Sequence, residues 1–233
     1  MMMQRGIGAL LLLAFLGSPA FARTLQVGNA NEFNQAVRMA KPGDTILLAP
    51  GEYAQNFYFQ NVHGTAKDPI VIAGSDPKNP PNLTGNTAPL HFSKASYLEL
   101  RHLVIRGASG NGLNIDDGGD ADRPSHHIQL KNLLVRDIGP RGNRDGMKLS
   151  GLDDFHVEDC ILERWGSGGS GIDMVGCHRG EILKCTFRNG GSNAVQAKGG
   201  SANISIRKCL FYNAGERAIN LGARQEILHF AHG

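Results

Sequence analysis

Aromatic residues and unbalanced charge are both scarce in this sequence. Only 6% of its 233 residues are aromatic, Trp occurs once, and Lys and Arg outnumber Asp and Glu by 24 to 21. Nucleic-acid-binding proteins commonly carry a basic run or stripe, and no such run is present here. We therefore expect no nucleic-acid partner, while the mildly basic balance permits binding to an anionic polymer.

Long apolar runs are missing as well. The run from Ile7 to Leu16 is much shorter than the roughly 20 residues that a transmembrane helix needs. It follows Arg5 and precedes Ala20-Phe21-Ala22, which is the pattern of a secretory signal peptide. We therefore expect a signal peptide over residues 1–22 and a single domain over residues 23–233. The mature protein is expected to be a secreted or periplasmic monomer with no membrane anchor.

A repeat of 24 to 30 residues organises most of the chain. Five segments share alternating apolar residues around one fixed column, with a polar residue directly before that column. The column residues are Leu103, Leu133, Cys160, Cys185 and Cys209. The polar residues before them are His102, Asn132, Asp159, Lys184 and Lys208. This pattern predicts a short strand, a bend and another short strand in every repeat.

A second block of four residues recurs once in each repeat. Its copies are GLNI (112–115), GMKL (146–149), GIDM (171–174), AVQA (194–197) and AINL (218–221). The second and fourth places are apolar and point inward, so the third place faces solvent. The outward residues are Asn114, Lys148, Asp173, Gln196 and Asn220. Short stacked strands without a helical period predict a parallel β-helix. A leucine-rich repeat is the main alternative, but its fixed ladder of Leu and Asn residues is missing here.

The four cysteines are predicted to be unpaired. Three of them lie in the inward column, where other repeats carry Leu, and a stack of three cannot pair completely. We interpret these three as buried thiols, and we expect Cys177 to be a surface thiol. A zinc site is not indicated, since the sequence has no CxxC motif and no close set of Cys and His.

An amphipathic helix is predicted over residues 30–41, ahead of the first strand. Phe33, Ala36, Val37 and Ala40 recur at helical spacing, and Pro42-Gly43 ends the run. A helix at this point would cover the open end of a β-solenoid, which otherwise exposes its apolar core and unpaired strand edges.

Two segments after this helix carry a resemblance to a known family. GDTILLAPGEY (43–53) and HGTAKDPIVIAG (63–74) resemble the amino-terminal part of secreted polysaccharide lyases of the chondroitinase B and alginate lyase type. Those proteins are right-handed parallel β-helices of the pectate-lyase-like superfamily. The fold class that we predict is therefore all-β, a single-stranded right-handed parallel β-helix with an N-terminal capping helix.

The resemblance implies cleavage of an acidic, uronate-containing polysaccharide by β-elimination, and this is the function that we predict. It also implies a calcium site of closely spaced Glu and Asn, with a Lys and an Arg on neighbouring coils as base and acid. The comparable strands of this chain contain no Glu-x-Glu pair, although Lys198 stands where a basic residue is wanted. The alternatives are a non-catalytic polysaccharide-binding or surface-structural β-helix, a β-helix glycoside hydrolase and a uronate epimerase.

Candidate site residues occupy the outward places of the second block and the positions beside them. A lyase needs a base next to a neutralised substrate carboxylate. The predicted catalytic residues are Lys148 or Lys198 as the base and Arg217 as the partner of the substrate carboxylate or the leaving oxygen. The predicted substrate-binding residues are Asn114, Gln196, Asn220 and Trp165. The predicted acids, for calcium or for orienting the bases, are Asp145, Asp173 and Asp116.

Simpler interpretations of the same residues stay open. The outward polar side chains also fit the ordinary solvated face of a β-helix, and Trp165 fits equally well as a residue that packs on the next coil. The insertions 116–126 and 138–146 flank the same strands and are predicted to wall a groove. Residues 224–233 depart from the template, so we expect the domain to be truncated at its carboxyl end.

Overall fold

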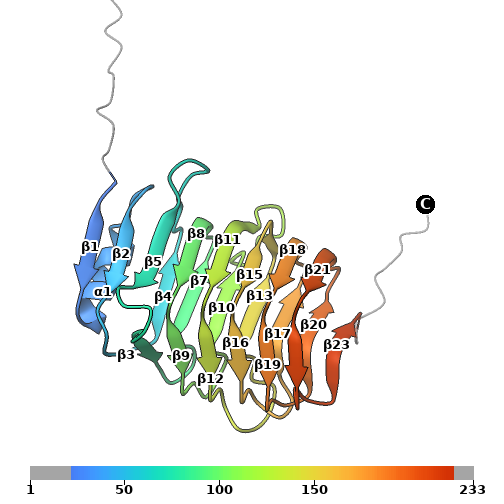
Figure 1. The fold of residues 1–233 in the computed structure, drawn as a ribbon. Coiled ribbons are helices and arrows are strands. Elements are labelled where there is room, and N and C mark those ends of the chain that lie inside the picture. The colour runs from blue at the N-terminus through green and yellow to red at the C-terminus, as the bar shows by residue number, and fades with distance from the viewer. Residues whose placement is uncertain (1–21, 223–233) are drawn as a thin grey trace, which may run out of the picture.

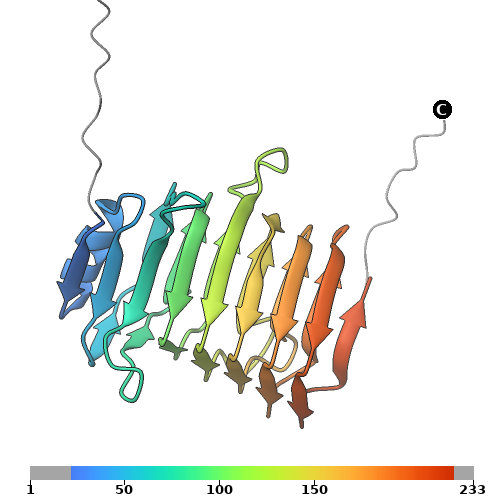
Figure 2. The same ribbon diagram turned by 45° about the horizontal axis from the view of Figure 1, so that its top comes forward.

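A computed structural model describes residues 22–222 of the chain. Residues 1–21 of the predicted signal peptide and the atypical residues 224–233 therefore lie outside the described part. The chain forms a right-handed parallel β-helix of about eight turns, with its coils stacked in chain order along one axis (Figures 1 and 2). This confirms the predicted fold class.

Three parallel sheets run the length of the solenoid. Sheet A contains β1 (Thr24–Val27), β2 (Thr45–Leu48), β5 (Ile70–Gly74), β8 (Ser96–Arg101), β11 (Ser125–Lys131), β14 (Leu152–Asp153), β15 (His156–Glu158), β18 (His178–Leu183) and β21 (Ala202–Arg207). Sheet B contains β3 (Glu52–Ala54), β6 (Asn82–Thr84), β9 (Val104–Arg106), β12 (Leu134–Arg136), β16 (Ile161–Glu163), β19 (Thr186–Arg188) and β22 (Leu210–Tyr212). Sheet C contains β4 (Phe57–Gln60), β7 (Leu90–Ser93), β10 (Leu113–Asp116), β13 (Met147–Ser150), β17 (Ser170–Val175), β20 (Asn193–Lys198) and β23 (Arg217–Leu221).

The polar residue before each column turns the chain from sheet A to sheet B. His102, Asn132, Asp159, Lys184 and Lys208 all have left-handed backbone, with φ between 51° and 56°. None of them is glycine, so each coil holds an ordinary residue in a conformation that costs it energy. The sequence pattern therefore located these bends correctly.

Helix α1 (Ala30–Arg38) covers the amino-terminal end of the stack (Figure 1). Asn29 caps it by accepting the Glu32 N–H, and Phe33 is fully buried among aromatic rings of β3 and β4. The helix ends at Arg38 rather than at residue 41. The residue before Pro42 is disfavoured in helical backbone, and the Asp44 carboxylate instead accepts the Lys41 N–H at 2.9 Å. No helix within residues 22–222 is long and apolar enough to cross a membrane.

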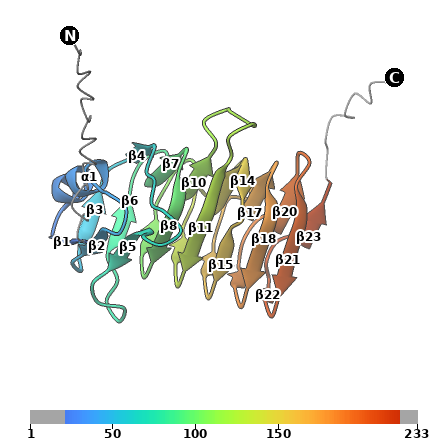
Figure 3. The ribbon, with the colours of Figure 1, turned by 90° about the horizontal axis from the view of Figure 1, so that it is seen from above.

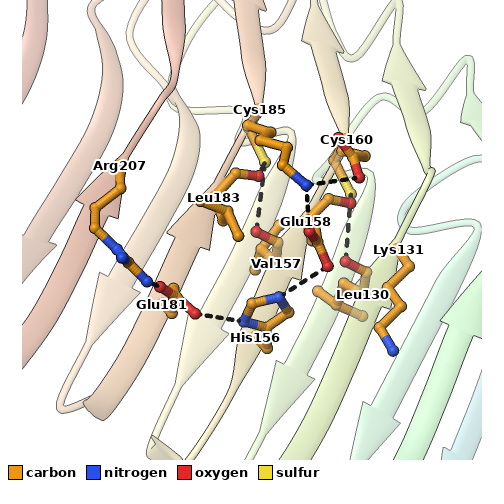
Figure 4. Close-up of polar contacts among 12 residues, drawn as sticks. Leu130, Lys131, His156, Val157, Glu158, Cys160, Glu181, Leu183, Cys185 and Arg207 are labelled. Atoms are coloured by element: carbon orange, nitrogen blue, oxygen red, sulfur yellow. Dashed lines mark hydrogen bonds and ion pairs between the residues drawn. The ribbon is translucent and has the colours of Figure 1, made fainter.

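The inward column is buried as far as Cys185 and opens at Cys209. Cys160 and Cys185 are fully buried, whereas Cys209 in the last described coil is partly exposed. Figure 4 shows the Cys160 and Cys185 thiols directed at backbone carbonyls of Leu130 and Val157 in the coils before them.

The prediction of a surface thiol at Cys177 is wrong, because this side chain is also fully buried. Asp153 pairs with His178, which places Cys177 in an inward column next to Leu152. Its Sγ donates to the Leu149 carbonyl at 3.4 Å.

Candidate functional site

The outward side chains of sheet C form one continuous row across seven strands. In register, they are Tyr58, His91, Asn114, Lys148, Asp173, Gln196 and Asn220. The last five occupy the outward places that the sequence predicts. Neighbouring members are about 4.8 Å apart at their backbones, so the row lines up chemically different groups along the solenoid axis.

Two lysines converge on one buried carboxylate at the centre of this row. The Lys148 ammonium binds Asp173 Oδ2 from the neighbouring strand, and the Lys198 ammonium binds the same oxygen at 3.0 Å. The Asp173 side chain points outward as predicted, but it is only 1% exposed because the two lysine side chains cover it. Its second oxygen, Oδ1, has no protein partner in the described part of the chain.

A second carboxyl group, that of Asp145, lies beside this cluster. Asp145 Oδ1 accepts the Ser170 N–H at 2.8 Å, and the residue is 2% exposed. Burial, and after it the negative charge of Asp173, raises the pKa of Asp145 to about 6, while the two lysines act in the opposite direction. The site therefore brings two lysine side chains and the Asp173 carboxyl group together with a second carboxyl group, whose pKa is raised to about 6.

His91 and Tyr58 extend the row toward the amino-terminal end. His91 Nε2 lies 2.5 Å from Asp116 Oδ2, and the Tyr58 ring meets the imidazole edge-on with centroids 4.8 Å apart. Burial acts to raise the pKa of Asp116, but hydrogen bonds from His91, Ser93 and the Gly118 N–H outweigh it and lower that pKa. Asp116 is thus an ionised carboxylate that holds an imidazole.

Neither His91 nor Tyr58 is among the sequence candidates. The repeat that is visible in the sequence begins at residue 97, and these two strands lie in the coils before it. The apolar alternation in LHFS (90–93) could have identified His91 as an outward residue. In the structure Leu90 and Phe92 are fully buried, and His91 between them is not.

Three of the predicted residues lie away from the lysine cluster or are buried. Arg217 begins β23 opposite Asn193, is half-exposed, and pairs with the adjacent Glu216 at 3.4 Å. Asn220 lies in the same terminal strand of the described chain. Trp165 is buried, and its indole N–H donates to the Gly191 carbonyl at 3.2 Å. The structure thus supports packing rather than an exposed sugar platform for Trp165.

The predicted calcium ligands are engaged by other groups. Within residues 22–222, no three Asp, Glu, His or Cys side chains converge in a way that could hold a metal ion. Asp173 is bound by two ammonium groups and Asp116 by His91. These contacts do not fit the six to eight oxygen ligands that calcium takes. Calcium binding by these residues stays a prediction.

The loop from Asp117 to Pro124 separates two cavities at the edge of sheet C, and it projects from the stack between β10 and β11 (Figure 3). One cavity, of about 450 Å³, is bounded by Lys94, Arg123 and His126. The other, of about 620 Å³, is bounded by Ser150 and His178 among others. The loop therefore borders both cavities, but no outward side chain of the sheet C row lines either of them. That it walls a groove along this row stays a prediction.

The second predicted wall has a different role. In the loop 138–146, the Arg144 and Gly142 carbonyls accept N–H groups of Gly166 and Gly168 from the next coil. These contacts tie the loop to the stack.

A family described as right handed beta helix region matches residues 89–229. No curated protein matches the chain. Among solved structures, an alginate lyase from Paenibacillus sp. strain FPU-7 is 22% identical with a TM-score of 0.69, over 85% of this chain and 75% of that one. A mannuronic acid specific family 6 polysaccharide lyase from human gut microbiota is 12% identical with a TM-score of 0.46, over 82% of this chain and 59% of the other. A GH136 lacto-N-biosidase from Eubacterium ramulus is 11% identical with a TM-score of 0.47, over 81% and 55%. At these identities the likeness shows the fold alone.

Proposed function

Because this chain belongs to the right-handed β-helix family, we propose that it is an exported carbohydrate-active protein that cleaves a uronate-containing polysaccharide by β-elimination on the outward face of sheet C. The observation that carries the proposal is the convergence of Lys148 and Lys198 on Asp173. The fold likeness to an alginate lyase agrees with the proposal but, as a likeness of fold, supplies no activity.

The lysine cluster suits the first requirement of β-elimination, which is neutralisation of the substrate carboxylate. The proton on the carbon beside a carboxylate becomes removable once that negative charge is balanced by a cation. A bound uronate can share Lys148 and Lys198 with Asp173, and Asp145 in its protonated form adds no opposing charge. The sequence also predicts one of these lysines as the base. Because both lysines bind the Asp173 carboxylate, we assign both to charge neutralisation.

Glycoside hydrolysis is the second candidate function, and Asp145 is the observation that favours it. A glycosidase pairs a protonated carboxylic acid with an ionised carboxylate. Asp145, with a pKa raised to about 6, suits the acid, and Asp173, which binds Lys148 and Lys198, is the second carboxyl group beside it.

The products formed from alginate, pectate and glycosaminoglycans distinguish these functions. Ultraviolet absorbance of new unsaturated ends is the result that we expect. Reducing ends without unsaturation would identify a hydrolase, and a changed uronate ratio without cleavage would identify an epimerase. Binding without any chemical change would identify a polysaccharide-binding protein and overturn the enzyme proposal.

Lys148→Ala and Lys198→Ala, tested singly, are expected to lower kcat/KM by at least about a hundredfold, because each removes a cation from the substrate carboxylate. Lys184→Ala is the matched control. Its ammonium pairs with Glu158 at 2.9 Å on sheet A, away from the proposed site, and its activity should equal that of the wild type. Folded Lys148 and Lys198 variants with full activity would show that the reaction occurs elsewhere.

A further inference from the structure

His91 is a member of the outward row, and its pair with Asp116 lies on the same face of sheet C as the lysine cluster. The two residues come from adjacent strands, β7 and β10, with Nε2 and Oδ2 2.5 Å apart. Both side chains are partly exposed, at 25% for His91 and 29% for Asp116. The pair is therefore open to a ligand on sheet C and is not sealed in the core.

The surroundings of His91 leave one of its ring nitrogens available. Asp116 occupies Nε2, and the Tyr58 ring packs edge-on against the imidazole. Within the described residues, no protein group binds Nδ1. An imidazole that donates through Nε2–H to a carboxylate keeps its lone pair on Nδ1, so the hydrogen bond to Asp116 fixes which nitrogen can accept a proton.

Asn114 lies between His91 and Lys148, in register with both. Each neighbour is one strand away, at a backbone distance of about 4.8 Å. The Asn114 side-chain oxygen is buried and has no protein partner among residues 22–222. A sugar ring placed over Asn114 would have the imidazole on one side and, once Lys148 turns back from Asp173, an ammonium group on the other.

We propose that His91 is the catalytic base and that Asp116 is a positioning residue that holds its tautomer. This inference rests on the proposed function. The C5–H bond of the uronate breaks and its proton goes to His91 Nδ1. The released electron pair forms the C4–C5 double bond while the C4–O4 bond breaks, and the departing oxygen takes the proton back from the imidazolium.

His91→Ala is expected to lower kcat by at least about a hundredfold while the affinity for uncleaved polymer stays that of the wild type. Added imidazole should restore part of the lost rate, because it replaces the missing base and nothing else. His91→Gln, which keeps more of the side-chain volume, serves where the alanine variant does not fold. Asp116→Asn should lower kcat without changing KM.

His156→Ala is the matched control, because this histidine also contacts carboxylates, those of Glu158 and Glu181, but on sheet A (Figure 4). It should keep full activity. A fully active His91→Ala protein overturns the assignment of His91 and leaves the proposed function intact. If both His91 variants lose activity and added imidazole restores the rate of neither, the assignment of His91 is overturned as well.

A separate measurement distinguishes failure of the proposed function. Wild-type protein is incubated with each polymer in D2O, and deuterium at C5 is measured. Exchange without cleavage would overturn the proposed lyase activity but would show that a base on the protein removes the C5 proton. In that case the assignment of His91 requires that His91→Ala abolishes the exchange. If the wild type neither cleaves nor exchanges, both proposals are overturned.

Discussion

The carboxyl group of Asp145 is buried, and burial disfavours its charged form. Its pKa of about 6 in the folded protein exceeds the ordinary value of 3.8. Between these two values the native state binds more protons than the unfolded state, so the free energy of unfolding falls as the pH rises from about 4 to 6. A shift of roughly two pKa units corresponds to about 3 kcal/mol.

Asp145→Asn is expected to remove this loss of stability. The amide oxygen can still accept the Ser170 N–H, while the charge is gone. The variant should be more stable than the wild type by about 1 to 3 kcal/mol at pH 7 and equally stable near pH 4. Urea unfolding at the two pH values measures this difference. A stability gap that is the same at both pH values would contradict the assignment.

The strands and corners of the coils follow from the sequence, because apolar alternation and repetition are local properties of the chain. The outward direction of Lys148 and Asp173 is predictable for the same reason. The burial of Asp173 is not, since it depends on Lys148 and Lys198 reaching this carboxylate from the two adjacent strands, β13 and β20. Likewise, Cys177 and Trp165 are buried by contacts with other coils, which a pattern within one coil does not contain.

Close packing between successive coils makes particular glycines necessary. A Cβ added to Gly190 would lie 2.1 Å from the Trp165 ring. Gly190→Ala is therefore expected to destabilise the protein by about 1 to 3 kcal/mol, which lowers Tm by several degrees in a chain of this size. Gly28→Ala is the control, because a Cβ there would meet only Glu32 Oε2 at 3.7 Å. Equal melting temperatures for the two variants would show that Trp165 moves aside freely.

The whole molecule is a one-dimensional stack in which each coil is covered by its neighbours. In the described chain, α1 covers one end, while Leu210, Tyr212 and Leu221 at the other end are more than half exposed. The coils next to that end are therefore expected to open first, because fewer apolar contacts hold them.

Thiol labelling of the native protein measures this gradient. Cys209 should react fastest, and Cys160, Cys177 and Cys185 should react only upon unfolding, because their side chains are fully buried. Burial also raises the pKa of both Cys160 and Cys177, which keeps these thiols in their less reactive form. Labelling of Cys160 as fast as that of Cys209 would be incompatible with the stacking order.

The left-handed corners have a consequence for how such a chain can change during evolution. The N–H groups of Asn132, Asp159 and Lys184 each donate to a carbonyl of the following coil, at 3.0 to 3.1 Å. The bend is thus held by the adjoining turn and not by its own side chain, which is why an amide, an acid and an amine serve equally. The bend of a duplicated or exchanged coil would therefore be held by hydrogen bonds to the coil that follows it. Outward side chains can therefore diversify, and the row on sheet C can lengthen, without a new fold having to be invented.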